Sequence, residues 1–427
     1  MTEPLSQPSG AGAPTRGAGP GPEDRSVAYL DSACMGRPRP ETMAEARALL
    51  ARMESGGTPP TDLVVELHGL YARARSALAR VFGADPADIA LVQSTSQGLG
   101  LVASALPLDP GDNVLVCDLE FFPPVLCWRT RCGTGGVEVR PVATRDGRVT
   151  PEDFAAAMDP RTRAIVVSSV QEVNGFRADI PALVALAHEH DVRLIVDGVQ
   201  EAGCLTLDLQ ALGADAYCAG GHKWLRNPFG MGFLYVAPSL AELLEPPFYG
   251  YFSAGEPAAG WEGYLSDPTR SPFDDLGFSG AMDRFELGGF GNYLGAAALA
   301  LTAEDLGNRG QAVVEDCVLA LNERLVEGLE ADHLRAAGVE LRSDLDPRSR
   351  SGITAFGLPG GHEEERLLGI FLRARGVFVS VRYTAGAGGV RVSPHEDCCE
   401  DDIDRLLHHL GEWVDLPPAL RREGVSG

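Results

Sequence analysis

The 427-residue sequence is poor in basic side chains, and lysine is almost absent from it. Acidic residues outnumber lysine and arginine by 60 to 36, which gives a formal net charge of -24. A chain with this charge offers no broad positive field to a nucleic-acid backbone or to an anionic membrane surface. We therefore expect it to bind neither nucleic acid nor membrane. The chain contains a single lysine, Lys223.

Long apolar runs and a regular cysteine pattern are also missing. No stretch approaches the roughly 18 consecutive apolar residues of a membrane-spanning helix, and the first residues lack the charged-then-apolar order of a secretion signal. The nine cysteines follow no regular spacing. Two of them, Cys398 and Cys399, are adjacent, which is poor geometry for sharing a metal ion. We expect reduced thiols, no metal site and a cytoplasmic location.

Composition divides the chain into a tail and a globular remainder. Residues 1–26 are rich in Gly, Pro, Ala and Ser, and they predict a disordered tail because they cannot bury enough apolar surface to offset the entropy of ordering. Beyond them, helical apolar patterns alternate with short apolar runs, which is typical of parallel βαβ units. The predicted strands include 89–92, 113–117, 164–168, 193–196, 216–218 and 232–236, and the predicted helices include 61–82, 99–106 and 181–190.

After about residue 290 the pattern changes to longer helices and shorter strands. The predicted helices there are 294–306, 311–329 and 400–414, and the predicted strands lie near 353–358, 377–381 and 389–392. We predict an α/β protein with a large domain over 27–290, whose mainly parallel sheet is sandwiched by helices. A smaller α+β domain is expected over 291–427.

Three places combine polar residues with the end of a predicted strand, where ligands of open α/β sheets bind. Residues 94–98, Ser-Thr-Ser-Gln-Gly, open a helix and suit either a phosphate or a plain N-cap. Asp197 could pair with a buried cationic ring nitrogen or cap the next helix. Lys223 lies among glycines and aromatic residues, where desolvation would lower the pKa of its amine and make it nucleophilic. The alternative for Lys223 is a surface lysine whose stem lies along apolar side chains.

Taken together, the three places match a known family in order and spacing. The strings Val-Asp-Gly-Val-Gln at 196–200 and Gly-His-Lys-Trp-Leu at 221–225 resemble the pyridoxal 5′-phosphate (PLP) binding core of the class V aminotransferase and cysteine desulfurase family. Further similar strings occur at 29–31, 94–98, 118–121, 284–286 and 390–395. The resemblance implies the PLP-dependent transferase fold (fold type I), a homodimer, and an N-terminal arm, 27–45, that packs on the small domain.

The resemblance also implies a role for each matching residue. Lys223 would carry PLP as a Schiff base, Asp197 would pair with the pyridine nitrogen, and Gln200 would hydrogen-bond the ring hydroxyl. Phe121 falls where the family stacks a side chain on the ring. Arg391 matches the arginine that receives the substrate's α-carboxylate, a planar pairing that suits a guanidinium.

The phosphate contacts implied by the resemblance are fewer than usual. The residues that match the family's phosphate contacts are Thr95, Ser96 and His222. Gly220 stands where a serine is common, and Gly289 stands where the partner subunit contributes a threonine. Each lost hydrogen bond to a charged group costs about 1.5–3 kcal/mol. We therefore expect weaker or differently arranged cofactor binding, with Asn292 replacing one of the contacts.

Other departures from the family bear on the reaction. Phe121 cannot move protons, whereas the histidine that desulfurases stack on the ring can. The loop 382–389 lacks the cysteine that forms a persulfide in desulfurases, which disfavours that reaction. The family's asparagine near the ring hydroxyl falls on Glu172 in a gapless match, while Asn174 follows two residues later, and both remain candidates.

These features predict a PLP enzyme that acts on the primary amine of a small amino acid or an amino-acid-like metabolite. Transamination is the first choice, and a carbon–sulfur β-lyase without a persulfide cysteine or an amino-acid epimerase are the alternatives. The choice is open because PLP supplies the electron sink while the pocket selects the bond that breaks. An alternative of another class is a non-catalytic scaffold or sensor, although the presence of Lys223, Asp197 and Arg391 together argues against it.

Overall fold

The computed structural model describes residues 27–423 except 58, 251–252, 272, 274–276, 278–280, 287–288 and 290. The tail predicted at 1–26 therefore lies outside the described residues. Among the helices of the described part, none combines the length and the apolar character that crossing a membrane requires.

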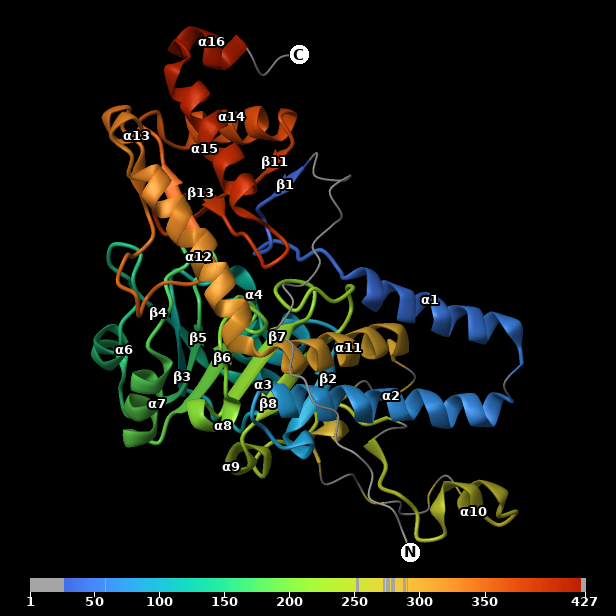
Figure 1. The fold of residues 1–427 in the computed structure, drawn as a ribbon. Coiled ribbons are helices and arrows are strands. Elements are labelled where there is room, and N and C mark those ends of the chain that lie inside the picture. The colour runs from blue at the N-terminus through green and yellow to red at the C-terminus, as the bar shows by residue number, and fades with distance from the viewer. Residues whose placement is uncertain are drawn as a thin grey trace, which may run out of the picture.

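A seven-stranded sheet in the order β2-β8-β7-β6-β5-β3-β4 forms the centre of the larger part of the molecule (Figure 1). Its strands are β2 (Ile89–Val92), β3 (Asn113–Cys117), β4 (Glu138–Val142), β5 (Thr162–Ser168), β6 (Arg193–Asp197), β7 (Ala216–Gly220) and β8 (Gly232–Val236). Neighbours are parallel from β7 to β4, and β8 is antiparallel to β2 and to β7. The predicted α/β class with a mainly parallel sheet is confirmed. The reversed direction of β8 was not predicted, because apolar runs carry no sign of strand direction.

Helices cover both faces of this sheet. Successive side chains of a strand point to opposite faces, so one strand contributes to two hydrophobic cores. On β6, Leu194 and Val196 point into one cluster of buried side chains and Ile195 points into the other. The helices of this part are α3 (Thr95–Ala105), α4 (Phe122–Leu126), α5 (Arg129–Gly135), α6 (Pro151–Ala157), α7 (Ile180–Glu189), α8 (Leu209–Leu212), α9 (Pro238–Ala241) and α10 (Gly260–Ser266), with short 3-10 turns at Pro86–Asp88 and Met282–Phe285. Side chains of α7 join the first core and those of α3 the second.

The C-terminal part has its own sheet and core. The antiparallel order is β12 (Ser380–Thr384), β13 (Ala387–Val392), β10 (Thr354–Gly357) and β9 (Glu340–Leu341), and the helices are α13 (Asp332–Ala336), α14 (Gly361–Ala374), α15 (Glu400–Asp415) and α16 (Pro418–Glu423). Strand β1 (Ala28–Tyr29) pairs in parallel with β11 (Val377–Phe378), so the start of the described chain lies on this part (Figure 1). The predicted domain boundary at 290 coincides with an undescribed residue and stays a prediction.

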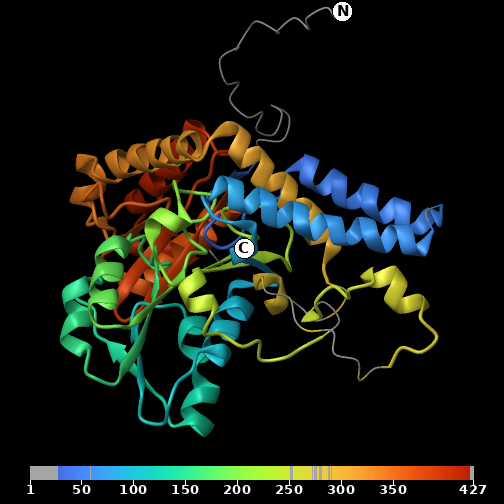
Figure 2. The same cartoon turned by 90° about the horizontal axis from the view of Figure 1, so that it is seen from below.

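Long helices connect and extend the two parts. Helix α12 (Gln311–Leu329) contributes Val314 to the core of the large sheet and Leu325 to the C-terminal core. Helices α1 (Pro40–Ser55) and α2 (Pro60–Val81) both pack on α11 (Tyr293–Arg309), and they project beyond the sheet in both views (Figures 1 and 2). The site described below lies where β6 and β7 end.

The backbone just after β6 has no room for a side chain, and this predicts a stability effect. A Cβ atom on Gly198 would lie 1.8 Å from Cζ of the fully buried Tyr217. We expect Gly198→Ala to lower the free energy of unfolding by about 1–3 kcal/mol through overpacking. Gly69→Ala is the matched control, since nothing lies within 4 Å of its Cβ in the interior of α2, and it should raise stability by about 0.5–1 kcal/mol.

Urea titrations followed by circular dichroism would measure both changes. Equal shifts of the two midpoints, or a stabilised Gly198→Ala protein, would contradict the packing described here.

Candidate functional site

The carboxyl ends of the parallel strands bring the candidate residues to one edge of the large sheet. Asp197 is the last residue of β6 and lies opposite Ser168, the last residue of β5. Strand β7 ends at Gly220, and the segment that follows it carries His222 and Lys223. The register of β5, β6 and β7 thus sets the positions of the carboxylate and the amine relative to each other.

Asp197 is a buried carboxylate with little compensation from the protein. Asp197 is 6% exposed. Among the described residues, only the N–H of Val199 donates a hydrogen bond to its carboxylate, at 3.0 Å. Burial, with a smaller contribution from nearby Glu120, raises the pKa of Asp197 to about 7, although the hydrogen bond from Val199 and the charge of Lys223 lower it. A carboxylate in this condition is strongly stabilised by a cationic N–H partner.

Lys223 is held in place through its backbone. A Cβ on Gly36 would lie 1.9 Å from the carbonyl oxygen of Lys223, and the N–H of Gly36 donates to the carbonyl of His222 at 2.9 Å. Burial lowers the pKa of the Lys223 amine, with Asp197 acting in the opposite direction. A lowered pKa increases the neutral, nucleophilic fraction of the amine at neutral pH. The two groups are therefore close enough for each to change the pKa of the other.

The N-terminus of α3 presents free donors at the same edge. Ser94 caps the helix, accepting a hydrogen bond from Gln97 N–H at 3.2 Å. The backbone N–H groups of Thr95 and Ser96 bond no other described residue. Together with the positive end of the helix dipole, these groups suit a phosphate.

Gly220 and His222 lie next to this helix end. The hydroxyl of Thr95 accepts a hydrogen bond from Gly220 N–H at 2.9 Å, and a Cβ at Gly220 would come within 3.0 Å of Thr95 Oγ1 and 3.1 Å of His222 Nδ1. Glycine at this position therefore lets both side chains approach. Burial, with a smaller contribution from Lys223, lowers the pKa of His222 to about 4, so His222 is a neutral hydrogen-bonding group near pH 7.

Three amide side chains predicted to contact the cofactor are engaged within the protein. Gln200 accepts from Trp224 Nε1 at 2.8 Å and donates to the carbonyl of Ala33 at 3.0 Å, which leaves one amide hydrogen for a ligand. Asn174 is 2% exposed and donates to the carbonyl of Gly147 at 2.7 Å. The cofactor roles of Gln200 and Asn174 stay predictions.

Asn292, the third of these residues, is the N-cap of α11. Its Oδ1 accepts from Gly295 N–H at 2.8 Å and its Nδ2 donates to the carbonyl of Gly230 at 2.9 Å. The structure thus gives Asn292 a capping role and an anchor on the segment before β8. A role in replacing a phosphate contact stays a prediction.

Glu172, one of the two candidates for the family's asparagine position, forms an ion pair in this chain. Glu172 follows β5 and its Oε2 lies 2.5 Å from Nη1 of Arg391 on β13. Arg391 also pairs with Asp31 at 3.2 Å. Both Arg391 and Glu172 influence the pKa of Lys223, the first lowering it and the second raising it. Which of Glu172 and Asn174 faces the ring hydroxyl of the cofactor stays a prediction.

Sequence reasoning did not pick out Cys34 and Gly36, which the arm brings to Lys223. Cys34 is exposed and raises the pKa of Lys223. The sequence pointed to them only through their position, since both residues closely follow the string at 29–31 that resembles the family. Phe121, which precedes α4, is 45% exposed and packs against Phe122 with ring centroids 4.2 Å apart.

These residues fit PLP. The uncompensated carboxylate of Asp197 suits a protonated pyridine nitrogen, the amine of Lys223 suits an aldehyde, and the free N–H groups at Thr95 and Ser96 suit a phosphate. When bound, PLP withdraws electrons from the carbon next to the substrate's nitrogen and so weakens the bonds at that carbon.

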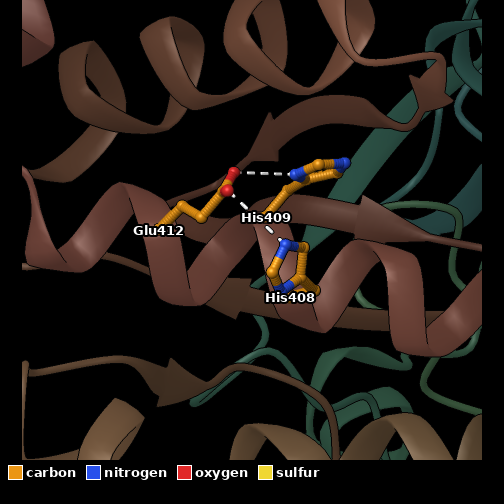
Figure 3. Close-up of side chains that lie close together, drawn as sticks. All are labelled: His408, His409 and Glu412. Atoms are coloured by element: carbon orange, nitrogen blue, oxygen red, sulfur yellow. Dashed lines mark hydrogen bonds and ion pairs between the residues drawn. The ribbon is translucent and has the colours of Figure 1, made fainter.

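A second cluster of polar side chains lies on α15, in the C-terminal part (Figure 3). His408, His409 and Glu412 are the only group of three or more potential metal ligands that the described residues bring together. The carboxylate of Glu412 lies 2.8 Å from His409 Nδ1, 3.4 Å from His408 Nε2 and 3.6 Å from Arg375 Nε. The guanidinium beside Glu412 would compete with a metal cation, so these contacts are those of a surface ion-pair cluster.

Sequence comparisons match most of the chain to one family. The family described as Aminotransferase class-V matches residues 28–406. An isopenicillin N epimerase of Streptomyces clavuligerus is 30% identical over 392 residues, which cover 91% of this chain and 95% of that protein. A cysteine desulfurase of Klebsiella pneumoniae (strain 342) is 30% identical over 366 residues, which cover 83% of this chain and 82% of that protein.

Solved structures agree on the fold. A C-DES variant with glycine covalently linked to its PLP cofactor has a TM-score of 0.81 at 23% identity, and the match covers 94% of this chain and 100% of that chain. The apo cysteine desulfurase of Thermococcus onnurineus NA1 has a TM-score of 0.78 at 21% identity, covering 91% of this chain and 94% of that chain. The predicted PLP-dependent transferase fold is confirmed.

The raised pKa of Asp197 predicts how the stability of the cofactor-free protein depends on pH. Because folding raises this pKa from about 4 to about 7, the protonated carboxyl is favoured in the folded state. The protonated carboxyl of Asp197 contributes fully to the free energy of unfolding below about pH 4, and this contribution is lost as the pH rises towards 7. Asp197→Asn should therefore gain stability relative to the unmutated protein between pH 5 and pH 8, by on the order of 2 kcal/mol.

Urea titrations of Asp197→Asn and of the unmutated protein at pH 5 and at pH 8 would test this expectation, through the difference between the two midpoints at each pH. Asp346→Asn is the control, since the hydrogen bonds from Arg348 lower the pKa of Asp346 to about 2, and its carboxylate is ionised at both pH values. A gap for Asp197→Asn that stays constant or shrinks with rising pH would contradict the assignment of an uncompensated buried carboxylate.

Proposed function

The chain belongs to the class V aminotransferase family of PLP-dependent enzymes, and we propose that it transaminates the primary amine of a small amino-acid-like metabolite. The observation that supports this proposal is that a desolvated amine, Lys223, and a buried carboxylate, Asp197, lie at the same edge of the sheet and act on each other's pKa. Membership of an enzyme family leaves the scaffold or sensor alternative without support.

Transamination needs a single base that takes a proton from the substrate carbon and returns it to the neighbouring cofactor carbon on the same face. The neutral amine of Lys223 can do this, since its lowered pKa brings it closer to the working pH. Asp197 would hold the ring nitrogen protonated and thereby keep the electron demand of the cofactor high. The donors at the start of α3 would anchor the phosphate and so fix the position of the cofactor relative to Lys223.

Two other reactions of the family remain second candidates, each for a specific reason. Epimerisation requires a proton donor on the opposite face, and Phe121 at the ring-stacking position has no ionisable group. The epimerase of Streptomyces clavuligerus nevertheless aligns with 91% of this chain, and Cys34 could supply the second proton. A β-lyase reaction is suggested by the relatives named cysteine desulfurase, again with Cys34 as the exposed thiol near Lys223.

Product analysis in deuterium oxide would distinguish the three reactions. The PLP-loaded protein is incubated with a panel of amines, and cofactor, carbonyl products and substrate are analysed by mass spectrometry. Transamination yields the aminated cofactor and a carbonyl compound, and Lys223→Ala should slow this step by about 10²- to 10⁴-fold. Cys34→Ser should leave it unchanged.

Other results of the same experiment would contradict transamination. Deuterium uptake with inverted configuration and no aminated cofactor would identify an epimerase, and release of a sulfur product would identify a lyase. Loss of either activity in Cys34→Ser would assign the thiol to that reaction.

The assembly and the location also belong to this proposal. We expect a cytoplasmic homodimer in which the partner covers the apolar surface near the site, where Phe121, Phe122 and Phe229 are 45%, 58% and 67% exposed. Analytical ultracentrifugation of the PLP-loaded protein would report a dimer, and a monomer would contradict it.

A further inference from the structure

Arg391, the residue expected to receive a substrate carboxylate, is already paired with two carboxylates of the chain. Its side chain is 2% exposed, and those of Glu172 and Asp31 are 12% and 16% exposed. Each of these contacts is long-range in sequence, since Glu172 follows β5 and Asp31 lies in the N-terminal arm. The three side chains thus form a nearly enclosed cluster with a formal charge of minus one.

Three of the five guanidinium N–H groups of Arg391 have acceptors within the chain. Of its five N–H groups, both on Nη1 have acceptors, the carbonyl and the carboxylate of Glu172. One on Nη2 donates to Asp31. The Nε atom is buried without a partner among the described residues. Only Nε and one hydrogen of Nη2 are left for a ligand, on a side chain that is 2% exposed and already paired with two carboxylates, so a substrate carboxylate at this edge would meet both anions.

The charges around Arg391 also disfavour a substrate carboxylate there. A substrate carboxylate beside Arg391 would be a third anion around one cation, in a site where burial weakens the screening between charges. Asp31 is further fixed by the hydroxyl of Ser380, which donates to it at 2.6 Å. An asparagine at position 172, where a gapless match places the family's asparagine, would leave Arg391 with one carboxylate fewer.

We propose that Glu172, together with Asp31, excludes a carboxylate next to the reacting amine, so that the substrate carries an uncharged or cationic group there. The preferred substrates are then amines such as amino-acid amides or amino alcohols, and Glu172 is a specificity-determining residue. This inference rests on the proposed function, and it replaces the expectation that Arg391 binds an α-carboxylate.

Binding of matched ligand pairs to the PLP-loaded protein tests the proposal without turnover. Alanine, serine and phenylalanine are compared with their amides, and the change in the cofactor's visible absorption gives each dissociation constant. We expect each amide to bind at least about tenfold more tightly than its free amino acid. In Glu172→Gln, which keeps the size and hydrogen bonding of the side chain, the ratio should move towards the free amino acid by about tenfold or more, equivalent to about 1.4 kcal/mol.

Comparing ratios between proteins removes the difference in amine basicity between an amino acid and its amide. Glu152→Gln is the matched control, because Glu152 is an exposed glutamate on α6, and it should leave the ratio unchanged. If Glu172→Gln fails to fold, Glu172→Asn provides the same comparison, and the preference of the unmutated protein remains measurable.

The outcomes separate this inference from the proposed function. Tighter binding of the free amino acids, or an unchanged ratio in Glu172→Gln, overturns the inference and makes the cluster a purely structural ion pair. If PLP occupies Lys223 but no ligand of either kind changes its absorption, the proposed function fails, and the inference fails with it.

Discussion

The site depends on one electrostatic relation, that between the buried carboxylate at the end of β6 and the amine on the segment after β7. Asp197 is costly to bury, as its raised pKa shows, and the desolvated amine of Lys223 offsets only part of that cost. A cationic ring nitrogen placed on Asp197 would remove the penalty and bind tightly for the same reason. Part of the free energy of cofactor binding would therefore come from pairing this carboxylate with the pyridinium nitrogen.

Three segments that are distant in sequence meet near Lys223. The arm after β1 fixes the backbone of Lys223 through Gly36, and the same arm provides Asp31 to Arg391. The segment after β5 provides Glu172, and β13 of the C-terminal sheet provides Arg391. The contacts of Arg391 join the large sheet, the arm and the C-terminal sheet. A substitution of Glu172 or Arg391 therefore also removes a contact between these parts.

Local patterns were sufficient to predict six of the seven strands of the large sheet and the two central residues. The edge strand β4, whose exposed and half-buried residues include a proline and an arginine, was not predicted. The apolar runs at 193–196 and 216–218 became β6 and β7, and the spacing of Asp197 and Lys223 led to the family. The helix predicted at 99–106 begins earlier, at Thr95, because Ser94 caps it and the polar first turn has no apolar pattern of its own.

Partners of polar side chains could not be predicted in the same way. The asparagine at 174 was a candidate for the cofactor, yet its amide bonds the carbonyl of Gly147, and Gln200 is shared with Trp224. The pairing of Arg391 with Asp31 spans 360 positions, and no local pattern reports a contact over that separation. For the same reason, Cys34 and Gly36 were not selected, since their importance comes only from where the arm folds back.

The central claim is that the amine at position 223 holds PLP covalently, and reduction with borohydride tests it most directly. After reduction and proteolysis, mass spectrometry should find the mass of the reduced cofactor on the peptide containing Lys223, which is unambiguous because the chain has no other lysine. Absence of the added mass on that peptide, with PLP present in excess, would contradict the account.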